Sequence, residues 1–240
     1  MAMFDHGSVR LHYQIEGDGF PVLLLAPGGM RSANDLWIRM PWNPRQALRD
    51  HYRIIGMDQR NAGASTAPIS SSDGWETFAD DQLSLLDHLQ IDRCHVIGMC
   101  IGGPYAMGLL RAAPERFCAA VLLQPVGVDG NNAVLRDMFD AWANELAPLH
   151  PEATAADWSA FGDHMFNGEF VLSATRADVA ACTTPLLVFM GDDQFHPQST
   201  SREIAALAPQ ATLVERWKTD EVLADTDATI KSFLSEHTPA

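Results

Sequence analysis

The stretch that most constrains the fold is Gly98-Met99-Cys100-Ile101-Gly102, because it separates two runs of different character. Residues 94–99 are mostly apolar, as expected for a strand covered on both faces, and residues 104–110 form a helix-like run. A cysteine on such a strand–turn–helix bend lies in strained backbone at the end of a sheet. Glycines two positions before and after it leave room for the bend. The alternative is a buried free cysteine beside packing glycines, which is a common arrangement.

The cysteine and charge content narrow the class of protein. Cys94, Cys100, Cys118 and Cys182 are widely spaced with no C-x-x-C pair, so we expect reduced thiols instead of disulfides or a zinc site. The net charge of −15 argues against nucleic acid or an anionic membrane as partner. Residues 1–6 lack the basic and then apolar pattern of a signal peptide, and no apolar run is long enough to cross a bilayer. The sequence therefore predicts a cytoplasmic protein.

Short apolar runs alternate with helix-like runs along most of the 240 residues, which can form one α/β domain with an insertion. Strands are expected at 8–16, 21–26, 53–57, 94–99, 118–123, 185–190 and 211–214, and helices at 75–91, 104–110, 199–207 and 221–234. The first strand alternates polar and apolar residues, which predicts an antiparallel edge strand. Residues 129–180 are helical in character without a strand. We therefore expect a core of residues 1–128 and 181–240 that carries a helical lid of residues 129–180.

Four motifs, taken in chain order, resemble those of the α/β-hydrolase superfamily. Pro27-Gly28-Gly29-Met30 resembles its oxyanion loop, with Pro27 where histidine is common. Residues 58–65 resemble its D-x-R-G-x-G-x-S loop, in which Asp58 and Arg60 order the loop and Asn61 replaces one glycine. Residues 98–102 resemble its nucleophile elbow, with cysteine in place of serine. Residues 191–197 resemble the loop that carries the catalytic acid.

The resemblance implies an α/β-hydrolase fold, with a mostly parallel twisted sheet, helices on both faces and a small helical lid. It implies an oxyanion hole made by the backbone amides of Gly29 and Ile101. The spacing to Pro197 favours Asp193 over Asp192 as the acid. No metal or organic cofactor is implied.

The chain departs from the superfamily pattern at two positions. A cysteine nucleophile is uncommon, although dienelactone-hydrolase-like members have one. The second departure is larger, because Arg216-Trp217-Lys218 stands where the general base of the family, a histidine, is expected. A thiol has a pKa near ~8.5 and is partly ionised at neutral pH, and a helix beginning directly after it lowers that pKa. The two departures are mutually consistent, because a nucleophile without the usual base is retained only as a thiol.

His196 is the histidine that we expect to replace the missing base, because it lies three residues after Asp193 in the same loop. Asp193 would orient it, as in a catalytic triad. The alternatives are that His196 caps the next helix or packs beside Phe195, and that Asp193 is a solvated acid or a helix cap. Lys218 is a lesser candidate for the base, since it more simply closes its loop, and His237 is expected at the surface.

Met30, Trp142 and His164 are the candidate substrate-binding residues. Trp142 belongs to an apolar set with Trp158, Phe161 and Met165, which is more typical of a lid core than of a substrate cage. His164 lies in the expected lid and has a structural role as its alternative. If part of this set faces the cleft, the substrate carries apolar or aromatic bulk.

The sequence as a whole predicts hydrolysis of an activated acyl compound, either an ester, a thioester, a lactone or a C–C bond of the diketone type. Cys100 would attack, and water would release the acyl thioester. Two alternatives stay open, namely a degenerate hydrolase that only binds a small molecule, and a non-hydrolytic acyltransferase or lyase. A small-molecule substrate is the expected partner, nucleic acid and membrane are not expected, and a homodimer stays open.

Overall fold

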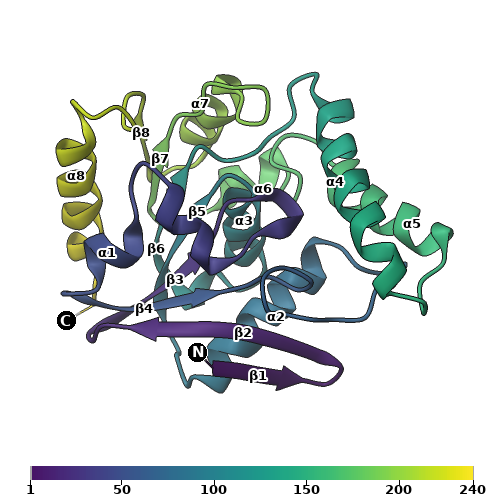
Figure 1. Ribbon diagram of the computed structural model, residues 1–240. Coiled ribbons are helices and arrows are strands. Elements are labelled where there is room, and N and C mark those ends of the chain that lie inside the picture. The colour runs from purple at the N-terminus through teal and green to yellow at the C-terminus, as the bar shows by residue number, and fades with distance from the viewer. Residues whose placement is uncertain (1, 240) are drawn as a thin grey trace.

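One eight-stranded sheet organises the chain, and the computed structural model describes residues 2–239 (Figure 1). The strands are β1 (Ala2–His6), β2 (Val9–Glu16), β3 (Phe20–Leu25), β4 (Tyr52–Met57), β5 (Cys94–Met99), β6 (Phe117–Leu123), β7 (Leu186–Phe189) and β8 (Ala211–Val214). Their order across the sheet is β1-β2-β4-β3-β5-β6-β7-β8. The pairs β1–β2 and β2–β4 are antiparallel, and the other five are parallel. The predicted fold class is confirmed.

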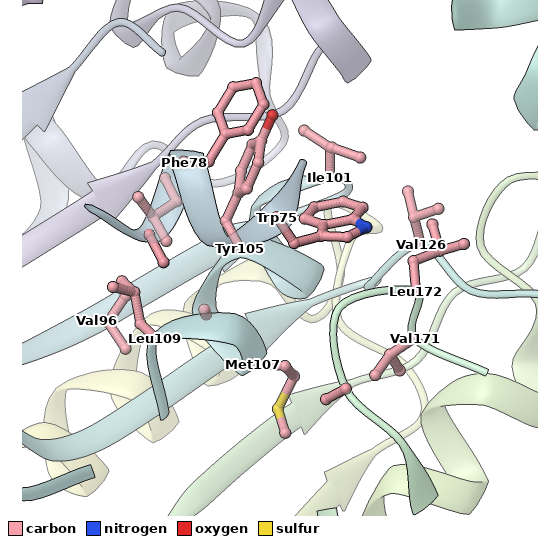
Figure 2. Close-up of a cluster of buried hydrophobic side chains, with 14 of the residues drawn as sticks. Trp75, Phe78, Val96, Ile101, Tyr105, Met107, Leu109, Val126, Val171 and Leu172 are labelled. Carbon is pink, nitrogen blue, oxygen red and sulfur yellow. The ribbon is translucent and has the colours of Figure 1, made fainter. Parts of the chain in front are cut away.

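Helices cover both faces of the sheet and bury an apolar core on each. They are α1 (Pro44–Leu48), α2 (Trp75–His88), α3 (Gly102–Ala112), α4 (Asn132–Leu146), α5 (Ala155–Phe166), α6 (Arg176–Ala181), α7 (Gln198–Leu207) and α8 (Leu223–Glu236). On one face, Trp75 and Phe78 of α2 pack against Tyr105 of α3 (Figure 2). On the other face, α1 and α8 bury Leu48 and Ile230 against the sheet. Burial on both faces explains why the central strands are apolar throughout.

The prediction that residues 8–16 form the edge of the sheet is wrong. These residues form β2, and β1 pairs outside it, from Ala2 opposite Tyr13 to His6 opposite Val9. The first six residues carry no hydrophobic alternation that would indicate a strand, because most of β1 is exposed. The hairpin depends on Gly7, whose φ of 61° is a conformation that glycine adopts without strain.

The segment between β6 and β7 contains α4, α5 and α6 and no strand. Figure 1 shows α4 and α5 side by side at the margin of the molecule, away from the sheet. Helix α4 packs against a short 3-10 helix, η1 (Gly29–Arg31). Within residues 2–239, none of these helices, nor any other, combines the length and apolar character needed to cross a bilayer.

His95, at the start of β5, is a buried titratable group away from the bend at Cys100. Its side chain is fully buried, and its Nε2 lies 2.9 Å from Thr238 Oγ1 near the C-terminus. Burial lowers the pKa of His95 to about 4, and the charges of His237 and Arg93 act in the same direction.

We expect this histidine to make the fold acid-sensitive. Above the ordinary histidine pKa of 6.5, His95 is neutral in the folded and unfolded chain and costs nothing. As the pH falls below that value, the unfolded chain takes up the proton first, so stability is lost down to the folded pKa. The free energy of unfolding should fall by about 2 kcal/mol between about pH 7.5 and about pH 5 through this group.

Urea unfolding of the wild type and of His95→Gln at both pH values measures this contribution. Glutamine has no ionisable group, so the variant should lose about 2 kcal/mol less than the wild type over the same interval. Equal losses in the two proteins would contradict the assignment to His95.

Candidate active site

Cys100 lies on a strained turn between β5 and α3. Its φ is +59°, which is sterically unfavourable for a side chain larger than glycine. The turn is held on both sides, since Cys100 N donates to Leu123 O at 3.0 Å and Cys100 O accepts from Val126 N at 3.1 Å. Cys100 is half-buried, whereas Cys94, Cys118 and Cys182 are buried. The geometry presents its thiol at the end of the sheet.

Gly98 and Gly102 are required by close approach of backbone. A Cβ atom on Gly98 would lie 2.0 Å from Gly102 O, and one on Gly102 would lie 2.1 Å from Leu25 O. Backbone at such distances cannot move aside in the way a flexible side chain can. The two glycines therefore let α3 begin against β3 and β5 directly after Cys100.

Gly98→Ala should destabilise the fold severely. The added methyl group forces β5 and α3 apart, and overpacking of this kind combined with backbone displacement costs roughly 4 kcal/mol or more. Thermal unfolding followed by circular dichroism measures the loss, with Gly108→Ala on α3 as the control, because a Cβ there would meet only Ser173, at an ordinary contact distance of 3.6 Å. Equal melting temperatures for Gly98→Ala and the wild type would contradict this account.

His196 and Asp193 form a fixed pair in the loop between β7 and α7. His196 Nδ1 lies 2.8 Å from Asp193 Oδ2, while Asp193 Oδ1 accepts from the amides of Phe195 at 2.8 Å and His196 at 3.1 Å. The carboxylate therefore organises its own turn and orients the imidazole. His196 is 7% exposed, and among the described residues its Nε2 meets no partner with good hydrogen-bond geometry. That atom is therefore available to interact with Cys100.

The Cys100 thiol and the His196 imidazole each shift the pKa of the other. Burial by itself would raise the pKa of Cys100, but interaction with His196 and with the amides of Gly28 and Ile101 outweighs it and lowers the pKa. Burial would likewise lower the pKa of His196, but Cys100 and Asp193 outweigh it and raise the pKa. Both shifts favour a thiolate beside an imidazolium, and the pair titrates as a unit.

The backbone amides that act on the Cys100 sulfur belong to Gly28 and Ile101. Within residues 2–239, neither amide donates to another backbone or side-chain oxygen, so both remain available as hydrogen-bond donors. Gly29, the predicted oxyanion residue, directly follows Gly28 and has a φ of +58°. The Gly28 contact could not be seen in the sequence, because it depends on how β3 lies beside β5.

Helix α4 packs against the loop of residues 27–31. A Cβ on Gly29 would lie 2.5 Å from Met138 Sδ of this helix, and Arg31 and Glu145 form an ion pair at 2.6 Å between η1 and α4. Met30, between Gly29 and Arg31 in η1, is buried at 1% exposure. Met138 is therefore a neighbour of the site that the sequence did not reveal, since one methionine in an amphipathic helix carries no signal of what it faces.

The structure does not join Trp142 or His164 to the Cys100–His196 pair. The ring centroid of Trp142 lies 5.6 Å from that of Phe139 and 5.7 Å from that of Trp158, inside an aromatic cluster of α4 and α5. His164 Nδ1 lies 3.0 Å from the Asp73 carbonyl oxygen. His164 also lines a cavity of about 550 Å³ whose wall includes neither Cys100 nor His196.

Other candidate residues have structural partners. Asp58 accepts from His12 Nδ1 at 2.8 Å and from Asn34 N at 2.7 Å, and so orders its loop. His237 Nδ1 lies 2.8 Å from the carbonyl oxygen of Phe233 at the end of α8. Lys218 Nζ donates to Gln124 and Asp192. In the part of the chain that the structure describes, no three histidine, cysteine, aspartate or glutamate side chains converge as metal ligands.

Comparison with known proteins gives related sequences and folds. RutD of Azorhizobium caulinodans, a carbamate hydrolase by name, is 32% identical over 148 residues, which are 61% of this chain and 52% of RutD. In three RutD proteins the matched part spans 38%, 52% and 41% of the relative, so the chain spans about half of their length or less. The 2-hydroxymuconate semialdehyde hydrolase of a Pseudomonas species is 26% identical, over 95% of this chain and 91% of that protein.

The solved structure of CumD from Pseudomonas fluorescens, a meta-cleavage product hydrolase, has the same fold. It superposes with a TM-score of 0.73 over 98% of both chains at 21% identity. Residues 21–153, more than half of the chain, match the sequence profile of the alpha/beta hydrolase fold. The match includes residues 27–30 and the bend at Cys100, and with the sheet order it shows that the chain belongs to the alpha/beta hydrolase fold family.

Proposed function

We propose that this protein is a hydrolase that cleaves an activated acyl compound through a covalent thioester on Cys100. The substrate class comprises esters, thioesters, lactones and C–C bonds of the diketone type. One observation carries the proposal: an imidazole oriented by Asp193 and two backbone amides all act on the same strained cysteine. Acyl transfer needs a nucleophile, a proton carrier and donors for an oxyanion, and these groups supply all three.

In the first step, the thiolate of Cys100 attacks the carbonyl carbon and forms a C–S bond. The C=O electron pair moves onto oxygen, which accepts hydrogen bonds from the Ile101 amide and the Gly28-Gly29 turn. When the intermediate collapses, the bond to the leaving group breaks and the imidazolium of His196 protonates the departing atom. An acyl thioester and a neutral imidazole remain.

In the second step, water attacks the thioester carbonyl while His196 Nε2 takes a proton from that water. The C–S bond then breaks, the carboxylic acid leaves, and the thiolate of Cys100 is restored. Asp193 on Nδ1 stabilises the imidazolium each time it forms. This assigns water activation to a histidine from the β7–α7 loop instead of the segment after β8.

The relatives support hydrolysis as the reaction type. Their names assign them carbamate, semialdehyde and meta-cleavage product hydrolysis, and carbamates and semialdehydes both carry a carbonyl group. The surroundings of the nucleophile favour an uncharged acyl group, because Met30 is buried at the oxyanion loop and Cys100, Met138 and Phe195 pack on the same apolar core.

The test uses p-nitrophenyl esters of increasing acyl length, with intact mass measured during and after the reaction. We expect release of p-nitrophenol beyond one equivalent and an acyl adduct that maps to Cys100. An adduct without turnover that passes to an added thiol or amine would indicate an acyltransferase. Binding of the esters without any adduct would leave a protein that only binds them.

A further inference from the structure

The segment after β8 braces the loop that carries the candidate base. Trp217 is buried, and its Nε1 donates to the carbonyl oxygen of Met190 at 2.9 Å. The next residue, Lys218, donates from Nζ to Asp192 Oδ1 at 2.5 Å. Met190 and Asp192 follow the end of β7 at Phe189 and precede the turn that orients His196. Both contacts therefore hold the start of that loop.

We propose that Lys218 is a positioning residue that holds His196 against Cys100 by anchoring Asp192. This inference rests on the proposed function, because it assigns a role in the same dyad. Asp192 precedes Asp193 directly, so a shift of Asp192 passes through one peptide bond to the carboxylate that orients the imidazole. The chain thus uses the segment that bears the histidine in the family pattern as the support of a histidine placed elsewhere.

A second contact of Lys218 ties the loop to the nucleophile's side of the site. Lys218 Nζ also donates to Gln124 Oε1 at 2.8 Å, and Gln124 directly follows β6 with a φ of +40°. The preceding residue, Leu123, accepts the backbone hydrogen bond of Cys100 at 3.0 Å. One ammonium group therefore bridges the end of β6, beside Cys100, and the end of β7, before His196.

Loss of the Lys218–Asp192 ion pair should disturb the geometry of the site and leave the overall stability nearly unchanged. The Lys218 side chain is 27% exposed and that of Asp192 is 53% exposed, so solvent screens their pairing and its contribution to folding is small. The reactivity of the Cys100–His196 dyad depends more strongly on this ion pair than folding does, because the proton carrier must be held within a fraction of an ångström of its working position. Loss of the brace should loosen the His196 contact that lowers the pKa of Cys100.

The experiment measures the pKa of Cys100 from the pH dependence of its alkylation by iodoacetamide, with the modified peptide identified by mass spectrometry. Lys218→Met and Asp192→Asn should each raise that pKa, with alkylation about 3- to 10-fold slower near neutral pH. Lys218→Arg should restore most of the wild-type rate, and melting temperatures should change by about 2 °C or less. The matched control is Lys231→Met, which removes the chain's other lysine and its ion pair with Asp227 on α8.

Opposite effects of the two variants would overturn the proposal. A charge acting only through space predicts that Lys218→Met raises the pKa of Cys100 and that Asp192→Asn lowers it, whereas positioning predicts a rise in both. If neither variant changes the pKa but His196→Ala raises it, this inference fails and the proposed function stands. If His196→Ala also leaves the pKa unchanged, the dyad itself is refuted, and the inference fails with it.

Discussion

Replacing Cys100 with serine is expected to reduce kcat/KM for an activated ester by roughly 10³-fold, with the fold unchanged. The thiol attacks as a thiolate whose pKa the site already lowers, whereas a serine hydroxyl must lose its proton to His196 during the attack itself. The substitution removes no buried volume of consequence, so thermal unfolding should be nearly unchanged. Initial rates with a p-nitrophenyl ester measure the loss.

Cys100→Ala gives the lowest rate expected in this measurement, because it removes the proposed nucleophile altogether. The serine variant should lie between the wild type and the alanine variant, and its acyl adduct should be an ester at residue 100 instead of a thioester. Wild-type activity in Cys100→Ala would contradict covalent catalysis at this position.

Replacing His196 with alanine is expected to lower kcat/KM by about 10² to 10⁴-fold and to raise the pKa of Cys100. Burial opposes the thiolate, and His196 is the largest influence that offsets burial, so the pKa should move above the ordinary thiol value of about 8.5. The alkylation rate of Cys100 near pH 7 should fall in parallel. Cys94, Cys118 and Cys182 are buried and should remain slow in both proteins.

Asp193→Asn separates orientation from proton transfer. Asparagine retains the carbonyl oxygen that accepts from the Phe195 and His196 amides, so the turn persists. It lacks the negative charge that the Asp193 carboxylate presents to the imidazole. Its effect should be smaller than that of His196→Ala and should appear mainly as a lowered pKa of His196. Unchanged alkylation of Cys100 in His196→Ala would refute the dyad, because it would show that the imidazole does not lower the pKa of the thiol.

The sequence was sufficient wherever a feature depends on neighbours in the chain. The glycines on each side of Cys100 indicated the bend, because a tight strand–turn–helix crossing leaves no room for Cβ atoms at these two positions, whatever surrounds the turn. Asp193 and His196 are three residues apart, and an aspartate that bonds the following amides turns the chain back on itself. The apolar runs placed the central strands for a similar reason, since burial on both faces excludes polar residues.

The tertiary structure decided which distant groups meet. Cys100 and His196 are 96 positions apart in the sequence, and they approach because β6 lies between β5 and β7 in the sheet, which brings their strand ends to one edge. The same order places Lys218 on Asp192, and the packing of α4 on η1 places Met138 over Gly29. Local backbone sterics can be read from a few consecutive residues. The approach of separate segments depends on sheet order and register, which no short stretch encodes.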